Sequence, residues 1–273
     1  MQVKYLIDEK TTIKDFIIKK ISRNFYGYLK EMNAVFTVDG VEKKSYEEVF
    51  LNNELTISYF GEDKQVGLYS YNPLDIIYED ACFIVVDKEP HLLSIPSKRE
   101  PKDSVYNRLL YYFKDTSNTV HLANRLDKEA KGLILVCKNK LARAALRDFE
   151  KVYIVKTDRS LALEKGTISD PIARSDDPLS IKRVVNQNEG DIAITHYELM
   201  SADDGIYTYK IRLETGRTHQ IRVHFAYYGC PLLGDQLYGG RESSDGTLQL
   251  LCASITYRDP FSKELKTFNS RFK

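Results

Sequence analysis

Two polar stretches that lie far apart in the chain carry the residues that could do chemistry. The first, residues 124–127, ends on the carboxylate of Asp127 and leads into the apolar run 132–136, which is short enough to be a buried strand. The second, residues 215–224, interleaves polar with apolar side chains, so one face can pack while a guanidinium or an imidazole points into a cleft. A buried carboxylate stays charged most readily beside a guanidinium. Asp127 and an arginine of the second stretch are therefore natural partners.

The length and composition exclude several classes of protein. A chain of 273 residues can form one large domain, or a large and a small one. The hydrophobic share of 42% and the charged share of 29% are typical of a soluble globular protein, and no apolar run approaches the roughly 18 residues that a membrane span needs. Residues 1–10 carry charges where the apolar core of a secretory signal would begin. We therefore expect a cytoplasmic protein that makes no membrane contact.

Basic residues gather in two parts of the sequence, although the net charge is only +1. Nucleic-acid binding depends on where cations cluster rather than on their sum. One group is Lys128, Lys131, Lys138, Lys140, Arg143 and Arg147, and the other is Lys210, Arg212, Arg217 and Arg222. Because Asp148 and Glu150 follow the first group directly, it could equally be a solvated helix face with ion pairs between successive turns.

The cysteines and histidines do not have the spacing of a metal site. The four cysteines are Cys82, Cys137, Cys230 and Cys252. They lie far apart and form no CxxC pair, so buried free thiols are expected. His219 and His224 would point to opposite faces of a strand, and no HExxH helix accompanies them. We expect neither a metal nor a cofactor.

Residues 1–66 are predicted to form a small separate module. Thr12, followed by Asp15, forms an N-cap before an apolar stripe of helical period, and a second short helix follows around residues 25–29. Short strands are predicted for residues 34–38 and 55–59. This order resembles the alpha-L RNA-binding motif, in which two helices precede a strand hairpin. A structural cap without RNA contact is the alternative.

The main domain is predicted to span residues 70–273, after a connector at residues 67–73 that ends on Asn72 and Pro73. A hairpin is expected around Glu79, and a helix over residues 141–149 behind an Asn139 cap. Further strands are predicted for residues 153–156, 192–200, 207–214, 220–225 and 248–256. Strands outnumber helices without regular alternation, which favours an α+β fold with a mixed, largely antiparallel sheet, flanking helices and a central cleft.

From about residue 76 to the C-terminus, the chain resembles the RluA-type pseudouridine synthases. The motifs occur in the order of that family: VVDK at 85–88, RLD at 125–127, GLIL at 132–135, KVY at 151–153, the run 215–224, and PLLGD at 231–235. Each motif alone is weak, but their joint order and spacing are specific. The resemblance implies an isomerase that converts uridine to pseudouridine in RNA and uses no cofactor. A monomer suffices for this reaction and is expected.

The resemblance also assigns three catalytic residues. The aspartate of the Arg-Leu-Asp motif maps onto Asp127, the guanidinium beside it onto Arg222, and the active-site aromatic residue onto Tyr153. A carboxylate can assist departure of uracil by attacking the sugar or by taking a sugar proton. Without the resemblance, Asp127 would be interpreted as a turn or helix cap, and Tyr153 could be a tyrosine of a core strand.

The substrate itself predicts further contacts, because a paired or stacked uridine must be turned out of its helix or loop. Arg125 could act as a wedge in the space left behind or bind a phosphate, and Arg217 could bind a phosphate or support the site. The RNA-binding residues expected are Arg125, Lys128, Lys131, Arg217, His219 and Gln220. Ribosomal RNA is the expected substrate, and transfer RNA is the alternative.

The chain departs from the family pattern close to the expected site. Asn124 replaces a histidine, Ala130 and Lys131 replace a Thr-Ser pair, and His91 stands where a glycine is usual. An RNA-binding protein that has lost catalysis is therefore the alternative function. An unrelated glycosidase-like hydrolase would need a second carboxylate across from Asp127, and no local motif supplies one.

Overall fold

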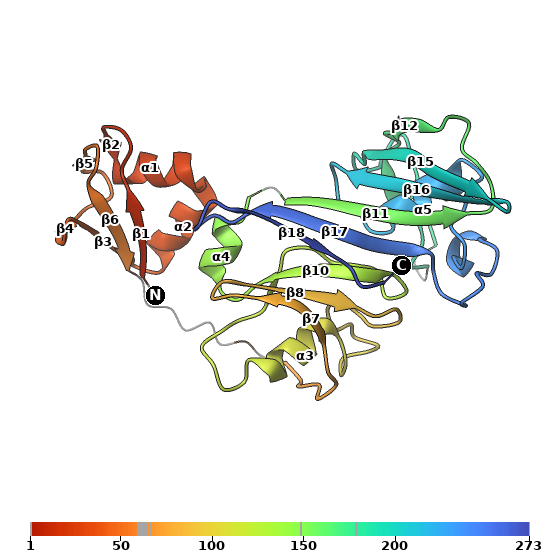
Figure 1. Ribbon diagram of the computed structural model, residues 1–273, viewed down its shortest axis with the longest axis horizontal. Coiled ribbons are helices and arrows are strands. Elements are labelled where there is room, and N and C mark those ends of the chain that lie inside the picture. Colours follow the sequence, from red (N-terminus) through yellow and green to blue (C-terminus); the bar gives the residue numbers. More distant parts are fainter. Residues whose placement is uncertain (1, 59–64, 66, 148, 178–179, 273) are drawn as a thin grey trace.

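The computed structural model describes residues 2–58, 65, 67–147, 149–177 and 180–272, and it consists of a small N-terminal module beside a long sheet (Figure 1). The helices are α1 (Ile13–Lys20), α2 (Arg23–Glu31), α3 (Val105–Tyr112), α4 (Lys140–Ala145) and α5 (Gln220–Tyr227), with a 3₁₀ turn η1 (Gln236–Tyr238). The strands of the N-terminal module are β1 (Gln2–Leu6), β2 (Thr11–Thr12), β3 (Val35–Val38), β4 (Val41–Lys43), β5 (Glu48–Val49) and β6 (Glu54–Ser58).

The main domain is built on a ten-stranded sheet. Its strands are β7 (Asp75–Glu79), β8 (Phe83–Lys88), β9 (His121–Leu122), β10 (Lys131–Cys137), β11 (Phe149–Thr157), β12 (Lys165–Ile168), β15 (Thr195–Asp203), β16 (Ile206–Leu213), β17 (Leu250–Arg258) and β18 (Leu265–Asn269), while β13 (Ile172–Arg174) and β14 (Arg183–Val185) form a separate hairpin. The order along the sheet is β12-β15-β16-β11-β17-β10-β8-β7, with β18 on β17 and β9 on β10. Of these pairs only β10 and β17 run parallel, so the predicted mixed, largely antiparallel α+β fold is confirmed.

The one parallel pairing depends on a glycine. Gly132, the second residue of β10, has a φ of 111°, a backbone conformation that residues with a side chain rarely adopt. A Cβ atom at this position would lie 2.4 Å from the carbonyl oxygen of Cys252 on β17. The two strands can therefore approach closely only because residue 132 has no side chain, and this contact holds the start of β10.

The N-terminal module contains the two predicted helices. The Thr12 hydroxyl accepts from the Asp15 N–H at the start of α1, and Ser22 caps α2 in the same way. The predicted strands correspond to β3 and β6, while β1, β2, β4 and β5 were not predicted from the sequence. Tyr59, the last residue of the second predicted strand, lies outside the described residues.

The core of the N-terminal module extends into the main domain. Leu141 and Ala145 of α4 belong to the same apolar cluster as Ile13 and Phe25 of the module. Figure 1 shows α4 between the module and the large sheet. The two parts therefore share a packed surface, and the boundary predicted near residue 70 stays a prediction.

The prediction of a strand at residues 220–225 is wrong, because these residues form α5. The helix is buried on nearly every side, so its apolar residues do not follow a single helical stripe. Apolar and polar residues instead alternate, which is the pattern of a strand. Ile221 and Phe225 join the main core, whereas Val223 packs into a separate small cluster with Ile172. The argument that His219 and His224 lie on opposite strand faces therefore does not apply.

Other predicted elements are found with shifted ends. The hairpin around Glu79 is the antiparallel pair β7 and β8. The helix behind Asn139 ends at Ala145, and residue 149 already begins β11. The expectation of free thiols is confirmed, with Cys82 only half-buried. Within the described ranges, no helix is both long and apolar enough to cross a membrane.

Candidate active site

Asp127 lies in the loop between β9 and β10, and its neighbours fix the loop backbone on both sides. The Leu126 N–H donates to the Ser94 hydroxyl over 2.9 Å, and that hydroxyl donates to the Leu126 carbonyl over 2.7 Å. On the other side, the Lys88 ammonium donates to the Lys128 carbonyl over 3.0 Å. The position of the Asp127 carboxylate is therefore determined by a backbone that can move little.

Lys88 is fully buried at the end of β8, which is unusual for a lysine. Its Nζ also donates to the carbonyls of Glu89 and Leu92, both over 2.8 Å. Burial lowers the pKa of Lys88 to about 7, against the attraction of Asp127 and other nearby carboxylates. The side chain ties the loop after β8 to the loop that carries Asp127.

Asn124 anchors the other end of the same loop to the sheet. Its Nδ2 donates to the Leu133 carbonyl over 3.1 Å, and its Oδ1 accepts from the Leu135 N–H over 2.9 Å. These bonds continue the hydrogen bonding of β10 through a side chain. The residue that replaces the usual histidine of the motif therefore has a structural partner on the sheet.

Arg222 of α5 binds two carboxylates at once. Its Nη1 donates to Asp127 Oδ2 over 3.2 Å, while its Nε and Nη2 donate to the two oxygens of Asp235, each over 2.8 Å. The side chains of Arg222 and Asp235 are 4% and 0% exposed, whereas that of Asp127 is 22% exposed. Although burial opposes it, the pKa of Arg222 is raised by its hydrogen bonds and attraction to Asp235 and Asp127. The structure thus brings together the two partners predicted from the sequence.

His219 lies on the other side of the Asp127 carboxylate and begins α5 with a φ of 58°. Its Nε2 lies 4.0 Å from Asp127 Oδ2, and its Nδ1 is 3.0 Å from the Tyr238 hydroxyl. That hydroxyl already accepts the Arg183 N–H over 2.8 Å, so its own proton can be donated to Nδ1. Burial lowers the pKa of His219, which leaves a neutral ring with its proton on Nε2, facing Asp127.

Tyr153 of β11 lies near the same carboxylate. The pairing of β11 with β17 changes register between Val152 and Tyr153, and such a bulge re-aims a side chain. Tyr153 is buried, and burial, the neighbouring Cys252 thiol and the Asp127 carboxylate raise its pKa well above the usual value. Its hydroxyl is therefore protonated at neutral pH. The role of Tyr153 in catalysis stays a prediction.

Comparison with known proteins agrees with the motif order. Residues 82–227 match the family model for RNA pseudouridylate synthase. An uncharacterised RNA pseudouridine synthase of Bacillus subtilis is 35% identical over 239 residues, which cover 84% of this chain and 84% of that protein. The chain belongs to the RNA pseudouridylate synthase family. It is therefore an isomerase that acts on RNA, and the RluA-type resemblance is confirmed.

Two further comparisons extend this result. Ribosomal large subunit pseudouridine synthase D of Haemophilus influenzae is 39% identical over 176 residues, which cover 62% of this chain and 54% of that protein. The solved structure of human RNA pseudouridylate synthase domain containing 1 has a TM-score of 0.57 and 23% identity, and the match covers 76% of this chain and 86% of that one. This second likeness concerns the fold.

Among the expected RNA-binding residues of this pseudouridylate synthase, three lie on or beside the Asp127 loop. Arg125 is exposed. Lys128 donates to both carboxylate oxygens of Glu100, each over 2.7 Å. Lys131 is buried, with its Nζ 3.6 Å from Asp245 Oδ2. Arg125 is thus exposed to solvent, while the two lysines have carboxylate partners, and their RNA contacts stay predictions.

Besides His219, the other two candidates also lie at the start of α5. Arg217 donates through Nε to the Ile192 carbonyl over 3.0 Å, and its Nη1 lies 3.5 Å from Asp191 Oδ2. Gln220 is buried, accepts from the Arg217 N–H and donates to the Ile194 carbonyl. The position of Gln220 indicates that it shapes the turn before α5, and an RNA contact by either residue stays a prediction.

Four residues of the site were not assigned a role from the sequence: Lys88, Ser94, Asp235 and Tyr238. Lys88 and Asp235 belong to two of the motifs that carry the resemblance, and a buried arginine needs a second carboxylate when its first partner is only partly buried. That reasoning could have found Asp235. Ser94 and Tyr238 act through backbone and ring contacts that no spacing rule predicts.

Proposed function

We propose that this pseudouridylate synthase modifies ribosomal RNA, and that Asp127 is the carboxylate that starts the reaction. The observation that carries the proposal is the pairing of Asp127 with a buried arginine over 3.2 Å. Within the described residues, Asp127 Oδ2 receives this hydrogen bond and Oδ1 receives none. One oxygen is thus held by Arg222 while the other is available to a nucleotide.

The reaction requires a charged carboxylate and no further reactant. The bond between N1 and C1′ breaks, the uracil turns, and C5 joins C1′, with no net oxidation or reduction. Asp127 can attack C1′ while uracil leaves with the electron pair, and C5 then displaces the carboxylate from C1′. Alternatively, Asp127 can take a sugar proton to give a glycal and return that proton to the sugar as C5 joins C1′. The proton on C5 then passes to solvent, and N1 gains one. We expect no cofactor or metal.

Arg222 and Tyr153 have separate roles in this proposal. Arg222 orients the Asp127 carboxylate through its hydrogen bond and offsets its charge. Tyr153 presents a ring on which the turned-out base can stack. Its raised pKa makes a phenolate base unfavourable, so its hydroxyl serves as a hydrogen-bond donor to the uracil or to Asp127.

The choice of ribosomal RNA is supported by the relative named ribosomal large subunit pseudouridine synthase D, of which this chain spans 54%. Turning the target uridine out of its helix or loop costs a few kcal/mol. We propose that residues 70–273 perform this step and that residues 1–66 form a separate module. A cytoplasmic monomer suffices for this mechanism, and transfer RNA is the other substrate to test.

Release of tritium from uracil C5 tests the catalytic role of Asp127. Wild-type protein and Asp127→Asn are incubated separately with ribosomal and transfer RNA labelled at C5. We expect release from ribosomal RNA by the wild type and a loss of at least ~10⁴-fold in the variant, as for removal of a catalytic nucleophile. Asparagine can still accept from Arg222, so fold and RNA binding should be retained.

Three results would contradict the proposal. Release by Asp127→Asn at the wild-type rate would exclude the role of Asp127. Release from transfer RNA alone would exclude ribosomal RNA as the substrate. No release by the wild type from either pool, together with tight RNA binding, would favour a protein that binds RNA without catalysis.

A further inference from the structure

His219 carries an N–H group that none of the described residues accepts. Its Nε2 lies 4.0 Å from Asp127 Oδ2, which is beyond the length of a hydrogen bond. Within the described part of the chain Nε2 has no other hydrogen-bond partner, whereas Nδ1 is 3.0 Å from the Tyr238 hydroxyl. The His219 side chain is only 10% exposed, so water can replace a missing partner only in part. A donor in this position is suited to a ligand.

Tyr238 determines which nitrogen of His219 carries the proton. The Tyr238 hydroxyl accepts the Arg183 N–H over 2.8 Å, which leaves its own proton for Nδ1. Burial raises the pKa of Tyr238, so the hydroxyl keeps that proton at neutral pH. The two rings meet edge to face, with their centres 5.8 Å apart and an angle of 87° between their planes. Nδ1 is therefore an acceptor and Nε2 is a donor.

The backbone of His219 has an unusual conformation. With φ at 58° and ψ at 18° it is left-handed, which is uncommon for a residue with a side chain, although His, Asn and Asp adopt it more often than most. The residue at the start of a helix often caps it by accepting a backbone N–H through its side chain, and His219 makes no such bond. The ring contacts Tyr238 and approaches Asp127 instead. Its position thus has a reason other than capping α5.

The gap between His219 and Asp127 matches a single hydroxyl group. An oxygen about 2.8 Å from both Nε2 and Asp127 Oδ2 can accept from the first and donate to the second. A carbonyl or phosphate oxygen can accept from His219 but has no proton to donate to Asp127. A phosphate would also be repelled by the carboxylate. The pairing of one donor with one acceptor therefore selects a hydroxyl.

The ribose 2′-hydroxyl is the hydroxyl that lies beside the reacting atom. In the proposed reaction Asp127 acts on the sugar, through the oxygen that Arg222 does not hold. The 2′-oxygen is carried by the carbon bonded to C1′, so it can face Oδ2 while Oδ1 faces the sugar carbons. Inside an RNA chain the 3′ and 5′ oxygens are esterified and have no proton. The 2′-hydroxyl is thus the ribose group that fits the gap.

We propose that His219 donates a hydrogen bond through Nε2 to the 2′-hydroxyl of the uridine that reacts, and that this hydroxyl donates to Asp127. The 2′-hydroxyl is the group by which a protein distinguishes RNA from DNA. His219 is therefore the residue that selects ribose at the target nucleotide. Tyr238 is a positioning residue, because it acts through the His219 ring. The inference rests on the proposed function for the action of Asp127 on the sugar.

A double-mutant cycle between the protein and the RNA tests this contact. The probe is a stem–loop of ribosomal RNA that the wild type binds, made with either uridine or 2′-deoxyuridine, each labelled with tritium at C5. Wild-type protein and His219→Asn are compared on both forms by kcat/KM for tritium release, and circular dichroism verifies the fold. Asparagine tolerates the left-handed backbone and can accept from Tyr238, but its side chain is too short to place an N–H at Nε2.

We expect His219→Asn to lower kcat/KM about tenfold on the ribose form and less than about twofold on the deoxyribose form, as for loss of one hydrogen bond. Tyr238→Phe should show the same selectivity with a loss of about threefold, because the His219 proton can then also occupy Nδ1. The matched control is His196→Asn, which changes a 40% exposed imidazole on β15 beside Glu214. It should alter kcat/KM by less than about twofold on either form.

Equal losses by His219→Asn on the two forms would overturn the proposal, because a purely structural role does not depend on the 2′ group. Selectivity of the same size in His196→Asn would also overturn it. If His219→Asn does not fold, Tyr238→Phe decides by the same criterion.

The two proposals fail in different ways. The same cycle is measured in Kd by fluorescence anisotropy, which needs no turnover. If the wild type binds the stem–loop and releases no tritium, the proposed function fails, while the selectivity in Kd still tests His219. If tritium release requires Asp127 and His219→Asn loses equal activity on both forms, the His219 proposal fails and the proposed function stands.

Discussion

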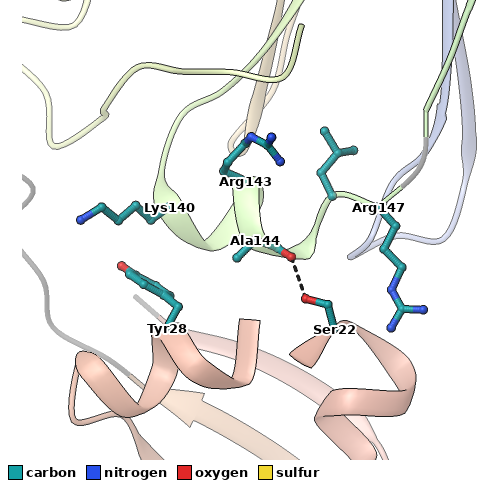
Figure 2. A pocket seen from close by; sticks show the side chains of 7 residues that line it. Ser22, Tyr28, Lys140, Arg143, Ala144 and Arg147 are labelled. Atoms are coloured by element: carbon teal, nitrogen blue, oxygen red, sulfur yellow. Dashed lines mark hydrogen bonds between the residues drawn. The ribbon is translucent and has the colours of Figure 1, made fainter. Parts of the chain in front are cut away.

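Two regions of the molecule hold their cations in opposite ways. At the Asp127 site, Arg222 is 4% exposed and shared between Asp127 and Asp235. On α4, Arg143 is exposed, and its side chain makes no hydrogen bond or ion pair with any described residue (Figure 2). A buried charge needs carboxylates to offset its lost hydration, whereas a solvated charge needs none.

The buried and the solvated cations are suited to different functions. Because its hydrogen bonds leave it one orientation, Arg222 can hold Asp127 in a fixed direction, as a reaction at a defined atom requires. An exposed cation such as Arg143 keeps its hydration and mobility, so it can attract any phosphate within reach and is screened by salt. One region is therefore suited to orientation and the other to attraction.

The most direct test of this comparison is the variant Asp235→Asn. The change leaves Arg222 buried with a single carboxylate, and removal of one partner of a buried pair costs several kcal/mol. We expect a loss of about 3 kcal/mol in the free energy of unfolding, at the lower end of the usual range because Asp127 remains. A displaced guanidinium should also lower kcat by roughly 10²-fold. Urea denaturation and tritium release measure the two effects.

A matched control for this change is Asp191→Asn. Asp191 pairs with Arg217 over 3.5 Å at the surface, where the two side chains are 72% and 41% exposed. An exposed pair contributes less than about 1 kcal/mol, so the stability of the control should stay close to that of the wild type. If the two variants lose similar stability, the distinction between buried and solvated charges does not hold.

Salt should affect RNA binding and the chemical step differently, with an effect of intermediate size. As salt rises, kcat/KM for RNA should fall with a log–log slope of roughly −3 or steeper, the value for four or more phosphate contacts. The value of kcat at saturating RNA should change by less than about twofold, because the Asp127 and Arg222 charges are shielded from solvent ions. Steady-state tritium release at several salt concentrations gives both constants. A parallel fall of kcat would place salt-sensitive charges at the reacting centre.

The sequence predicted the site better than its supports. Asp127 could be paired in advance with an arginine of residues 215–224, because a carboxylate and a guanidinium in one cleft stabilise each other regardless of the local backbone. The resemblance to the family selected Arg222 among them. The element that carries Arg222 was predicted wrongly, since α5 is buried on nearly every side and its residues show no single apolar face. The pairing of the two side chains was thus predicted correctly although the secondary structure around Arg222 was not.

The contacts that fix the Asp127 loop were beyond prediction. Ser94 and Lys88 act on backbone carbonyls and N–H groups, and any residue type offers these. Lys131 also shows a limit of counting charges, since it is buried beside Asp245, more than one hundred residues later in the chain. Lys140 and Arg143 were noted in a basic cluster, but their position beside the N-terminal module depends on how that module packs.

The smallest expected effect concerns a group on α5 that is buried without charge. His224 is fully buried, with Nε2 donating to the Asp170 carbonyl and Nδ1 accepting from the Thr195 hydroxyl, each over 2.9 Å. Burial lowers its pKa below the ordinary 6.5. Between these two values the unfolded chain binds more protons than the folded one, so the free energy of unfolding falls as pH falls through 6.5.

Replacement by a group that cannot titrate isolates this contribution. His224→Gln keeps an amide donor for the Asp170 carbonyl and an acceptor for Thr195, so the fold should be retained. We expect the decline in the free energy of unfolding from pH 7 to pH 5 to be shallower in the variant than in the wild type, as measured by urea denaturation at each pH. An unchanged decline would mean that His224 becomes protonated as easily in the fold as in water. A buried helix would then tolerate an added charge without the carboxylates that Arg222 has, and the contrast between the two regions would lose its physical basis.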